Sequence, residues 1–140
     1  MPDTVHATTV AIGGLGVLIT GPSGSGKSDL ALRLIDRGAV LVADDRTRVW
    51  RDGDRLLAGV PDTISGMLEV RGLGIVEMRW TSDVPLALCV WLGDEPDRLP
   101  SPRTRTIAGV DLPELALDPR PASAAIKVEL ALSHPDGVTV

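Results

Sequence analysis

Short apolar runs separated by glycine-rich or charged segments mark the first half of the chain. The runs are rich in β-branched and aliphatic residues and end at glycines or aspartates, a pattern typical of strands. One stretch differs, because apolar residues recur at helical spacing from residue 27 to 37 and Gly38 is placed to end a helix. The expected strands are residues 5–12, 16–20 and 39–43, followed by a hairpin of residues 47–51 and 55–58.

The second half of the chain has more glycine and proline between its apolar runs. Residues 61–74 contain several glycines, and we expect a loop with a short helix there. Strands are expected at residues 75–80 and 86–92, a loop at 93–105, a strand and turn at 107–117, and a final helix at 122–132. A strand, loop, helix and strand at the front, with mostly strands behind, predict an α/β fold with a mixed β-sheet.

Residues 21–28, which we call the glycine-rich loop, match the G-x-x-x-x-G-K-[ST] spacing of a P-loop. They are Gly21, Pro22, Ser23, Gly24, Ser25, Gly26, Lys27 and Ser28. Glycines let successive backbone N–H groups point at phosphate oxygens, and the helix that follows directs its positive end at the same anion. Lys27 would supply a cation for the β- and γ-phosphates, and the Ser28 hydroxyl could ligate Mg²⁺. The motif lies between an apolar strand and an amphipathic helix, so we expect a Mg-nucleotide site rather than a glycine-rich turn without a ligand.

Two adjacent carboxylates, Asp44 and Asp45, end the apolar run of residues 39–43. Open α/β sheets bind their ligands at the carboxyl ends of strands. One aspartate there could hold Mg²⁺, and the second could accept a proton from an attacking hydroxyl. The alternative is an acidic turn, which a neighbouring P-loop makes the weaker interpretation.

Length and charge narrow the class of protein. A chain of 140 residues fits one domain, and its net charge of −5 weighs against sequence-independent binding to nucleic acid. It has no apolar run long enough to span a membrane and no secretory signal at its start, so we expect a cytoplasmic protein without a membrane partner. Cys89 is the only cysteine, and its apolar surroundings favour a buried side chain over a reactive thiol.

Two stretches resemble one family in particular. The first, ITGPSGSGKSDLALRLIDRGAVLVADD, joins the glycine-rich loop to the paired aspartates, and the second is MLEVRGLGIVEM at residues 67–78. Together they resemble the HPr kinase/phosphorylase family, whose signature is close to L-L-E-I-R-G-L-G-I-I-D. The resemblance covers about residues 5–99 and implies a P-loop nucleotide-binding domain of the HPr kinase/PEP carboxykinase kind. It implies residues 1–140 as a single HPr kinase-like catalytic domain without the N-terminal regulatory domain of longer members, and Met1 favours a naturally short form.

The resemblance assigns roles to individual residues. Lys27 matches the P-loop lysine, Ser28 the Mg²⁺-binding serine, and Asp44 a neighbour of the metal. Asp45 matches the carboxylate that acts as base in phosphorylation and as acid in the reverse reaction. Glu69 matches a second carboxylate associated with the metal.

The resemblance also implies roles for three residues that carry no signal alone. His6 matches a histidine at the active site that precedes the P-loop, and Arg98 matches a later catalytic arginine in a D-R-L context. Arg71 belongs to the signature loop with its glycines, Gly72 and Gly74. Without the family pattern, His6 would be a surface histidine, Arg98 a solvated arginine, and Glu69 with Arg71 a surface ion pair.

The implied function is an ATP- and Mg²⁺-dependent serine-protein kinase that phosphorylates HPr or an HPr-like phosphocarrier in regulation of the phosphotransferase system. The family also catalyses phosphorolysis of the phosphoserine. Residues 118–123 are the nearest match to the family's C-terminal motif, which is close to P-V-[KR]-P-G-R, but they lack its Gly-Arg. This departure weighs against the reverse activity and against the hexamer of longer members. A homo-oligomer stays open. The alternatives are a P-loop kinase for a small metabolite and a non-catalytic P-loop nucleotide sensor.

Overall fold

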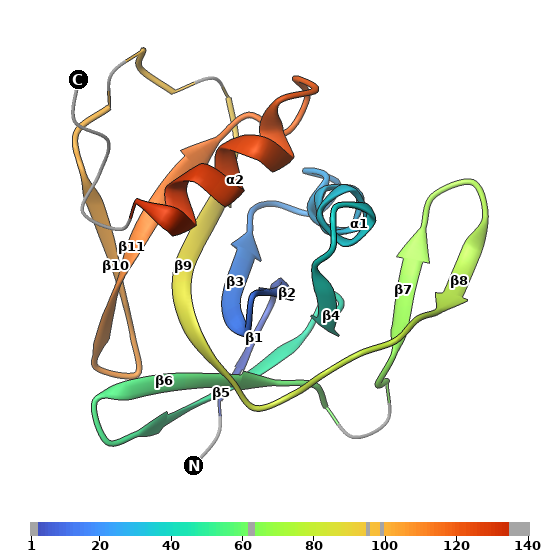
Figure 1. Cartoon of the computed structure of the whole chain (residues 1–140), viewed down its shortest axis with the longest axis horizontal. Helices are drawn as coiled ribbons and strands as arrows, with labels where there is room; N and C mark the ends of the chain where they lie inside the picture. Colours follow the sequence, from blue (N-terminus) through green and yellow to red (C-terminus); the bar gives the residue numbers. More distant parts are fainter. Residues whose placement is uncertain (1–2, 62–63, 95, 99, 135–140) are drawn as a thin grey trace.

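The apolar runs of the sequence form the strands of one mixed sheet. The computed structural model describes residues 3–61, 64–94, 96–98 and 100–134, and these contain a nine-stranded sheet, a two-stranded hairpin and two helices (Figure 1). The large sheet consists of β1 (Asp3–Val5), β2 (Thr8–Ile12), β3 (Leu15–Thr20), β4 (Val40–Ala43), β5 (Thr47–Asp52), β6 (Arg55–Gly59), β9 (Val84–Leu92), β10 (Arg103–Ile107) and β11 (Val110–Leu117). The hairpin consists of β7 (Met67–Val70) and β8 (Gly74–Glu77), and the helices are α1 (Lys27–Asp36) and α2 (Ala124–Ser133).

Strand β9 is the centre of the large sheet. It runs parallel to β3 on one side, and on the other side its start pairs antiparallel with β6 and its end parallel with β11. The strands follow the order β1-β5-β6-β9-β3-β2-β4, with β10 and β11 branching from β9. Parallel and antiparallel pairs in one sheet confirm the expected mixed α/β fold.

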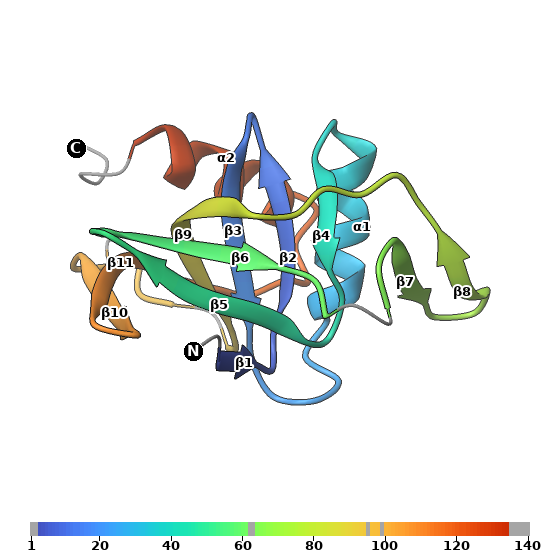
Figure 2. The same ribbon diagram turned by 90° about the horizontal axis from the view of Figure 1, so that it is seen from below.

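The sheet separates two hydrophobic cores. Side chains alternate along β3, so that Val17 and Ile19 face the helices while Leu18 faces the β5–β6 hairpin. The helix-side core receives Leu30 and Leu34 from α1, which the helical spacing predicted. Figure 2 shows the β5–β6 hairpin crossing in front of β3 and β2, with both helices behind them.

One edge of the sheet brings several segments together. Strand β3 ends there and leads into the glycine-rich loop and α1, and β4 ends there at Asp44 and Asp45. Strand β2 starts at the same edge, because Thr8 pairs with Ile19 of β3 and Thr9 with Ala43 of β4. This edge therefore carries the residues for which sequence and resemblance predicted a site.

The region of residues 61–74 was expected to be a loop with a short helix, and that prediction is wrong. Residues 62 and 63 lie outside the described part of the chain, and residues 67–70 form strand β7. Leu68 is buried whereas Met67 and Glu69 are exposed, which is the alternation of a strand with one face covered. The glycines of this region lie in the turns at both ends of β7. Because they are so frequent, the alternation of buried and exposed residues in this short strand could not be recognised in the sequence.

Smaller differences concern the ends of elements. The single strand expected at residues 5–12 is divided at His6 and Ala7, because β1 pairs with β5 while β2 pairs with β3 and β4. The expected loop at 93–105 yields its last residues to β10. The final helix lies at Ala124–Ser133, close to the predicted 122–132.

Candidate functional site

The glycine-rich loop curls tightly between β3 and α1. Gly26, the residue before α1, has φ 102°, a left-handed conformation that favours glycine over residues with a side chain. The Ser25 N–H donates to the Pro22 carbonyl at 3.0 Å, which closes a turn inside the loop. The first N–H groups of α1 have no partner within the helix, so its positive end lies beside the loop.

Lys27 is folded back onto this loop. Its residue is only 7% exposed, and its Nζ donates to the carbonyls of Gly21 at 3.0 Å and Pro22 at 3.1 Å. Both of these partners are neutral carbonyls. A buried ammonium group bonded to neutral carbonyls keeps a strong attraction for an anion. The loop therefore holds a positive charge ready at its inner surface.

Asp44 is fixed by donors from three elements. Its Oδ1 accepts from the Ser28 hydroxyl at 2.6 Å and from the Thr8 hydroxyl at 3.0 Å. Its Oδ2 accepts from the backbone N–H of Glu69 at 2.9 Å. These bonds tie the end of β4 to α1, to β2 and to the β7–β8 hairpin.

Asp45 points elsewhere, although it is the next residue. It adopts a left-handed backbone with φ 66°, and its Oδ1 lies 2.7 Å from His6 Nε2. Its backbone N–H donates to the Thr8 hydroxyl at 3.1 Å, so Thr8 links both aspartates. The Asp45 side chain is 64% exposed, and this leaves a carboxylate oxygen accessible to a proton donor.

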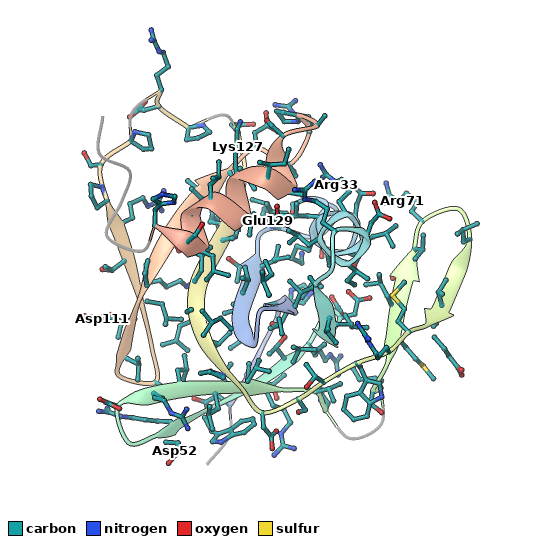
Figure 3. All side chains as sticks on the ribbon, viewed as in Figure 1. Arg33, Asp52, Arg71, Asp111, Lys127 and Glu129 are labelled. Carbon is teal, nitrogen blue, oxygen red and sulfur yellow. The ribbon has the colours of Figure 1, made fainter. Side chains whose placement is uncertain are left out.

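A cleft of about 710 Å³ lies between the glycine-rich loop and the tip of the β7–β8 hairpin. Ser28 and Asp45 lie on its inner side, and Glu69, Arg71 and Gly72 come from the hairpin. In Figure 3, Arg71 of the hairpin lies between β7 and α1, whereas Arg33 of α1 lies toward α2. The cleft is thus lined by a loop suited to anions, by the accessible carboxylate of Asp45 and by the long, positively charged side chain of Arg71.

The family model for the HPr serine kinase C-terminal domain matches residues 2–82, which include the glycine-rich loop, both aspartates and the β7–β8 hairpin. The chain belongs to this family. Curated relatives include the HPr kinase/phosphorylase of Lactiplantibacillus plantarum, 38% identical over 129 residues, covering 82% of this chain and 41% of the relative. The HPr kinase/phosphorylase of Lacticaseibacillus casei strain BL23 is 38% identical over 143 residues, covering 91% of this chain and 45% of the relative.

A solved structure of the HPr(Ser) kinase/phosphatase from Coxiella burnetii shares the fold. It matches with a TM-score of 0.81 and 28% identity, and the match covers 94% of this chain and 95% of that chain. The present chain spans less than half the length of the two curated relatives, at 41% and 45%. Family membership and fold are therefore established, and the expected resemblance is confirmed.

The structure of this HPr serine kinase family member brings most of the expected site residues to one place. Ser23, Gly24, Gly26, Lys27, Ser28, Asp45 and Glu69 line the cleft. Asp44 and His6 adjoin it through their hydrogen bonds to Ser28 and Asp45. Their expected roles stay predictions, because the arrangement alone assigns no chemistry.

Arg98 lies apart from these residues. It is exposed on the segment after β9, and it is absent from the described residues that line the cleft. Gly21, Pro22 and Ser25 shape the glycine-rich loop without lining the cleft. The catalytic role expected for Arg98 stays a prediction.

The expected metal ligands offer oxygen atoms, the ligands that Mg²⁺ prefers. Ser28 Oγ and Asp44 Oδ1 are adjacent at 2.6 Å, and Glu69 lines the cleft beside them. No group of three or more His, Cys, Asp or Glu side chains is spaced for a metal within the described residues. This donor set suits a cation that keeps several waters and shares phosphate oxygens, as Mg²⁺ does in nucleotide sites.

Sequence reasoning missed Thr8 and the backbone of the hairpin. Thr8 is fully buried, and its hydroxyl is the link between Asp44 and Asp45. Its position depends on the register of β2 against β4, which no local pattern specifies. The only available signal was its place two residues after His6 at the start of an apolar run.

Within the described residues, no helix is long and apolar enough to cross a membrane.

Proposed function

We propose that this chain transfers the γ-phosphoryl group of ATP, with Mg²⁺, to a serine hydroxyl of HPr or an HPr-like phosphocarrier protein. The observation that carries the proposal is the pair of aspartates beside the glycine-rich loop, one bonded to Ser28 and the other to His6. The names of the curated relatives and of the solved structure support the same class of reaction.

Asp45 is the proposed base for the acceptor serine. Its exposed carboxylate opens onto the cleft, and His6 holds one of its oxygens at 2.7 Å. The serine hydroxyl would donate its proton to the carboxylate as its oxygen attacks the phosphorus atom. Thr8, which accepts from the Asp45 N–H, would keep the backbone of the base in place.

The glycine-rich loop is the proposed site of the phosphates. Lys27 would exchange its bonds with the Gly21 and Pro22 carbonyls for bonds with phosphate oxygens. Because phosphoryl transfer needs little covalent work from the protein, positioning and charge stabilisation carry the catalysis. Arg71 lines the same cleft and offers a further positive charge near the transferring group.

Ser28, Asp44 and Glu69 are the proposed ligands of Mg²⁺. When bound, the cation would neutralise charge on the β- and γ-phosphates. Before that, the Glu69 N–H and the Thr8 hydroxyl hold the Asp44 carboxylate in a fixed orientation. In the reverse reaction, inorganic phosphate would attack the phosphorus of the phosphoserine, pyrophosphate would form, and Asp45 would return a proton to the departing serine oxygen.

The test is mass spectrometry of the organism's own HPr-like protein after incubation with this chain and Mg-ATP. We expect a gain of one phosphate on a serine, and a rate at least about 100-fold lower with Lys27→Ala, since removal of one charge-stabilising donor has effects of this size. Lys127→Ala is the matched control, because Lys127 is the only other lysine and is exposed on α2. It should keep the wild-type rate.

Other outcomes separate the alternatives. ATP binding without transfer to any protein would support a nucleotide sensor. Transfer to a small hydroxyl compound in the absence of the carrier would support a metabolite kinase. Full activity of Lys27→Ala would contradict the proposed role of the glycine-rich loop.

A further inference from the structure

One arginine of α1 holds a segment from the last third of the chain beside the glycine-rich loop. Arg33 Nη2 donates to the Pro119 carbonyl at 2.6 Å, and its Nη1 donates to the Pro121 carbonyl at 3.3 Å. We call residues 118–121 the outer segment, which directly follows β11. The family model ends at residue 82, so its match includes Arg33 but not the outer segment. These bonds therefore join a matched part of the fold to an unmatched part.

The outer segment meets the glycine-rich loop at Gly26. A Cβ added to Gly26 would lie 3.6 Å from Pro119 Cγ and 3.7 Å from Pro119 Cβ. Apart from the two neighbouring residues, no other atom of the described chain comes within 4 Å of that position. Gly26 has φ 102°, and its carbonyl accepts from the Leu30 N–H at 2.9 Å in the first turn of α1. The proline ring thus lies against the residue that connects the loop to Lys27.

Close packing alone does not hold the outer segment in this place. A hollow of about 450 Å³ is lined by residues of the loop, of α1 and of the outer segment, so these parts are not packed together throughout. Dispersion contacts are lost across such a space, and directional bonds must then set the position of the segment. Asp118 and Arg120 stiffen the segment itself, with Nε–Oδ1 at 2.9 Å and Nη2–Oδ2 at 3.0 Å. Arg33 fastens it to α1.

Arg33 also has a charged partner, which offers a different explanation for an effect on phosphate binding. Its Nη2 lies 3.2 Å from the Asp29 carboxylate, and Asp29 lines both the hollow and the cleft proposed for the phosphates. A positive charge beside that carboxylate lessens its repulsion of a phosphate. The Asp29 side chain is 70% exposed, so solvent weakens this charge effect. The bonds to the two carbonyls are the stronger constraint on geometry.

We propose that Arg33 is a positioning residue for phosphate binding by the glycine-rich loop. The inference rests on the proposed function, in which Lys27 and the start of α1 bind the phosphates. By holding Pro119 against Gly26, Arg33 keeps the end of the loop in its binding conformation. A loop that is already ordered loses less conformational freedom when a ligand binds. The affinity for phosphates therefore depends on Arg33 without a contact between Arg33 and the phosphates.

The experiment is calorimetry of Mg-ATP and of inorganic tripolyphosphate with Mg²⁺, on the wild type, Arg33→Leu and Arg33→Lys. Tripolyphosphate carries no nucleoside, so a loss shared by both ligands reports on the phosphates. Lysine keeps a positive charge near Asp29, but its ammonium group lacks the planar fork that spans the two proline carbonyls. We expect the Kd of both ligands to rise about tenfold or more in both variants.

Arg37→Leu is the matched control. Arg37 also ties α1 to the C-terminal part of the chain, through Glu129 of α2 at 2.8 Å, but it lies at the end of α1 away from the loop. Both ligands should bind this variant within about twofold of the wild type. Thermal unfolding of every variant shows that it is folded at the assay temperature. Similar Tm losses in Arg33→Leu and Arg37→Leu, with weaker binding only in the first, separate positioning from a general loss of stability.

Pro119→Ala tests the contact with the loop. It removes the ring atom nearest to Gly26 and keeps the carbonyl to which Arg33 donates. We expect the Kd of both ligands to rise about threefold or more. Wild-type affinity of this variant would overturn the proposal.

Three further outcomes are decisive. Wild-type affinity of Arg33→Lys would overturn the proposal in favour of a charge effect through Asp29. A loss for Mg-ATP alone would overturn it as well, since Arg33 would then act on another part of the nucleotide. Failure of the wild type to bind either ligand would instead overturn the proposed function, so the two failures are distinguishable.

Discussion

At the scale of single residues, polar groups near the site are bound in pairs and triplets. Asp44 accepts from three donors, and Asp45 and His6 form a pair of their own. Because charge-assisted hydrogen bonds are among the stronger ones in proteins, these bonds give the site a defined geometry before any ligand arrives. Asp118 and Arg120 do the same for the segment before α2.

The Asp118–Arg120 pair makes stability depend on pH. The side-chain and backbone hydrogen bonds from Arg120 hold the pKa of the Asp118 carboxyl below its ordinary value of 3.8. A lowered pKa in the folded state means that the pair stabilises the protein above that ordinary value, and that this stabilisation is lost as pH falls further. The Tm of the wild type should thus exceed that of Asp118→Asn by a constant amount above about pH 5, and the difference should shrink toward pH 3.

Thermal unfolding followed by circular dichroism between pH 3 and pH 7 would measure this Tm difference. The range covers the pH values over which the Asp118 carboxyl begins to be protonated. Asp54→Asn serves as the control, since Asp54 lies in the exposed turn between β5 and β6. Its Tm difference from the wild type should not follow the same profile. A difference for Asp118→Asn that is equal at every pH would show that the pair contributes nothing through its charge.

Much of the site could be predicted at this scale, and the reason is local sequence. Lys27 and Ser28 follow from the spacing of the glycine-rich loop, and the two aspartates follow from the end of an apolar run. Thr8 could not be predicted, because its contact with Asp44 depends on two strands that are distant in sequence. His6 was found only through resemblance, and its bond with Asp45 supplies a physical reason for its place.

At the scale of elements, the β7–β8 hairpin is the wall of the cleft that stands away from the large sheet (Figure 1). Leu68 anchors it in the helix-side core, and the Glu69 N–H anchors it to Asp44. The strands that were predicted carry apolar runs, whereas β7 is short and flanked by glycines. Its strand conformation follows from pairing with β8, which local propensity does not reveal.

Gly66 at the base of this hairpin should tolerate no side chain. Its φ is +73°, and a Cβ there would lie 2.7 Å from Trp80 Cδ1 and 3.1 Å from the Met78 carbonyl oxygen. Gly66→Ala therefore adds a clash to the strain of a left-handed residue. We expect it to lower the free energy of unfolding by about 1 to 3 kcal/mol more than a glycine-to-alanine change that brings strain alone.

Gly72→Ala at the tip of the same hairpin supplies that comparison. Gly72 has φ +89°, and no atom lies within 4 Å of an added Cβ. Urea unfolding monitored by tryptophan emission gives both values, and the native emission of Gly66→Ala should also change, since Trp80 is displaced. Equal losses for the two variants would mean that the base of the hairpin relaxes without cost.

At the scale of the whole molecule, the large sheet lies between the two hydrophobic cores and closes each of them on one side. Strand β9 supplies Leu88 and Val90 to the helix-side core, and Leu86 and Cys89 to the core under the β5–β6 hairpin. The order of the strands around β9 could not be predicted, because it joins segments from both ends of the chain. The mixed α/β class could be predicted, since it depends only on the succession of elements.

Cys89 reports on this closure as the single thiol of the chain. It is 0% exposed, and burial raises the pKa of its thiol above the ordinary 9.0. A thiol that is both covered and protonated can react only when β9 is released from its neighbours, and that opening disrupts both cores together. With Ellman's reagent at about pH 8, the Cys89 thiol of the native protein should be labelled at least about 1,000-fold more slowly than that of the protein unfolded in urea. A typical free energy of unfolding of about 5 kcal/mol requires a difference of this size. The labelling rate should rise with urea in step with global unfolding. Fast labelling without urea would show that β9 opens locally, and the two cores would then be independent.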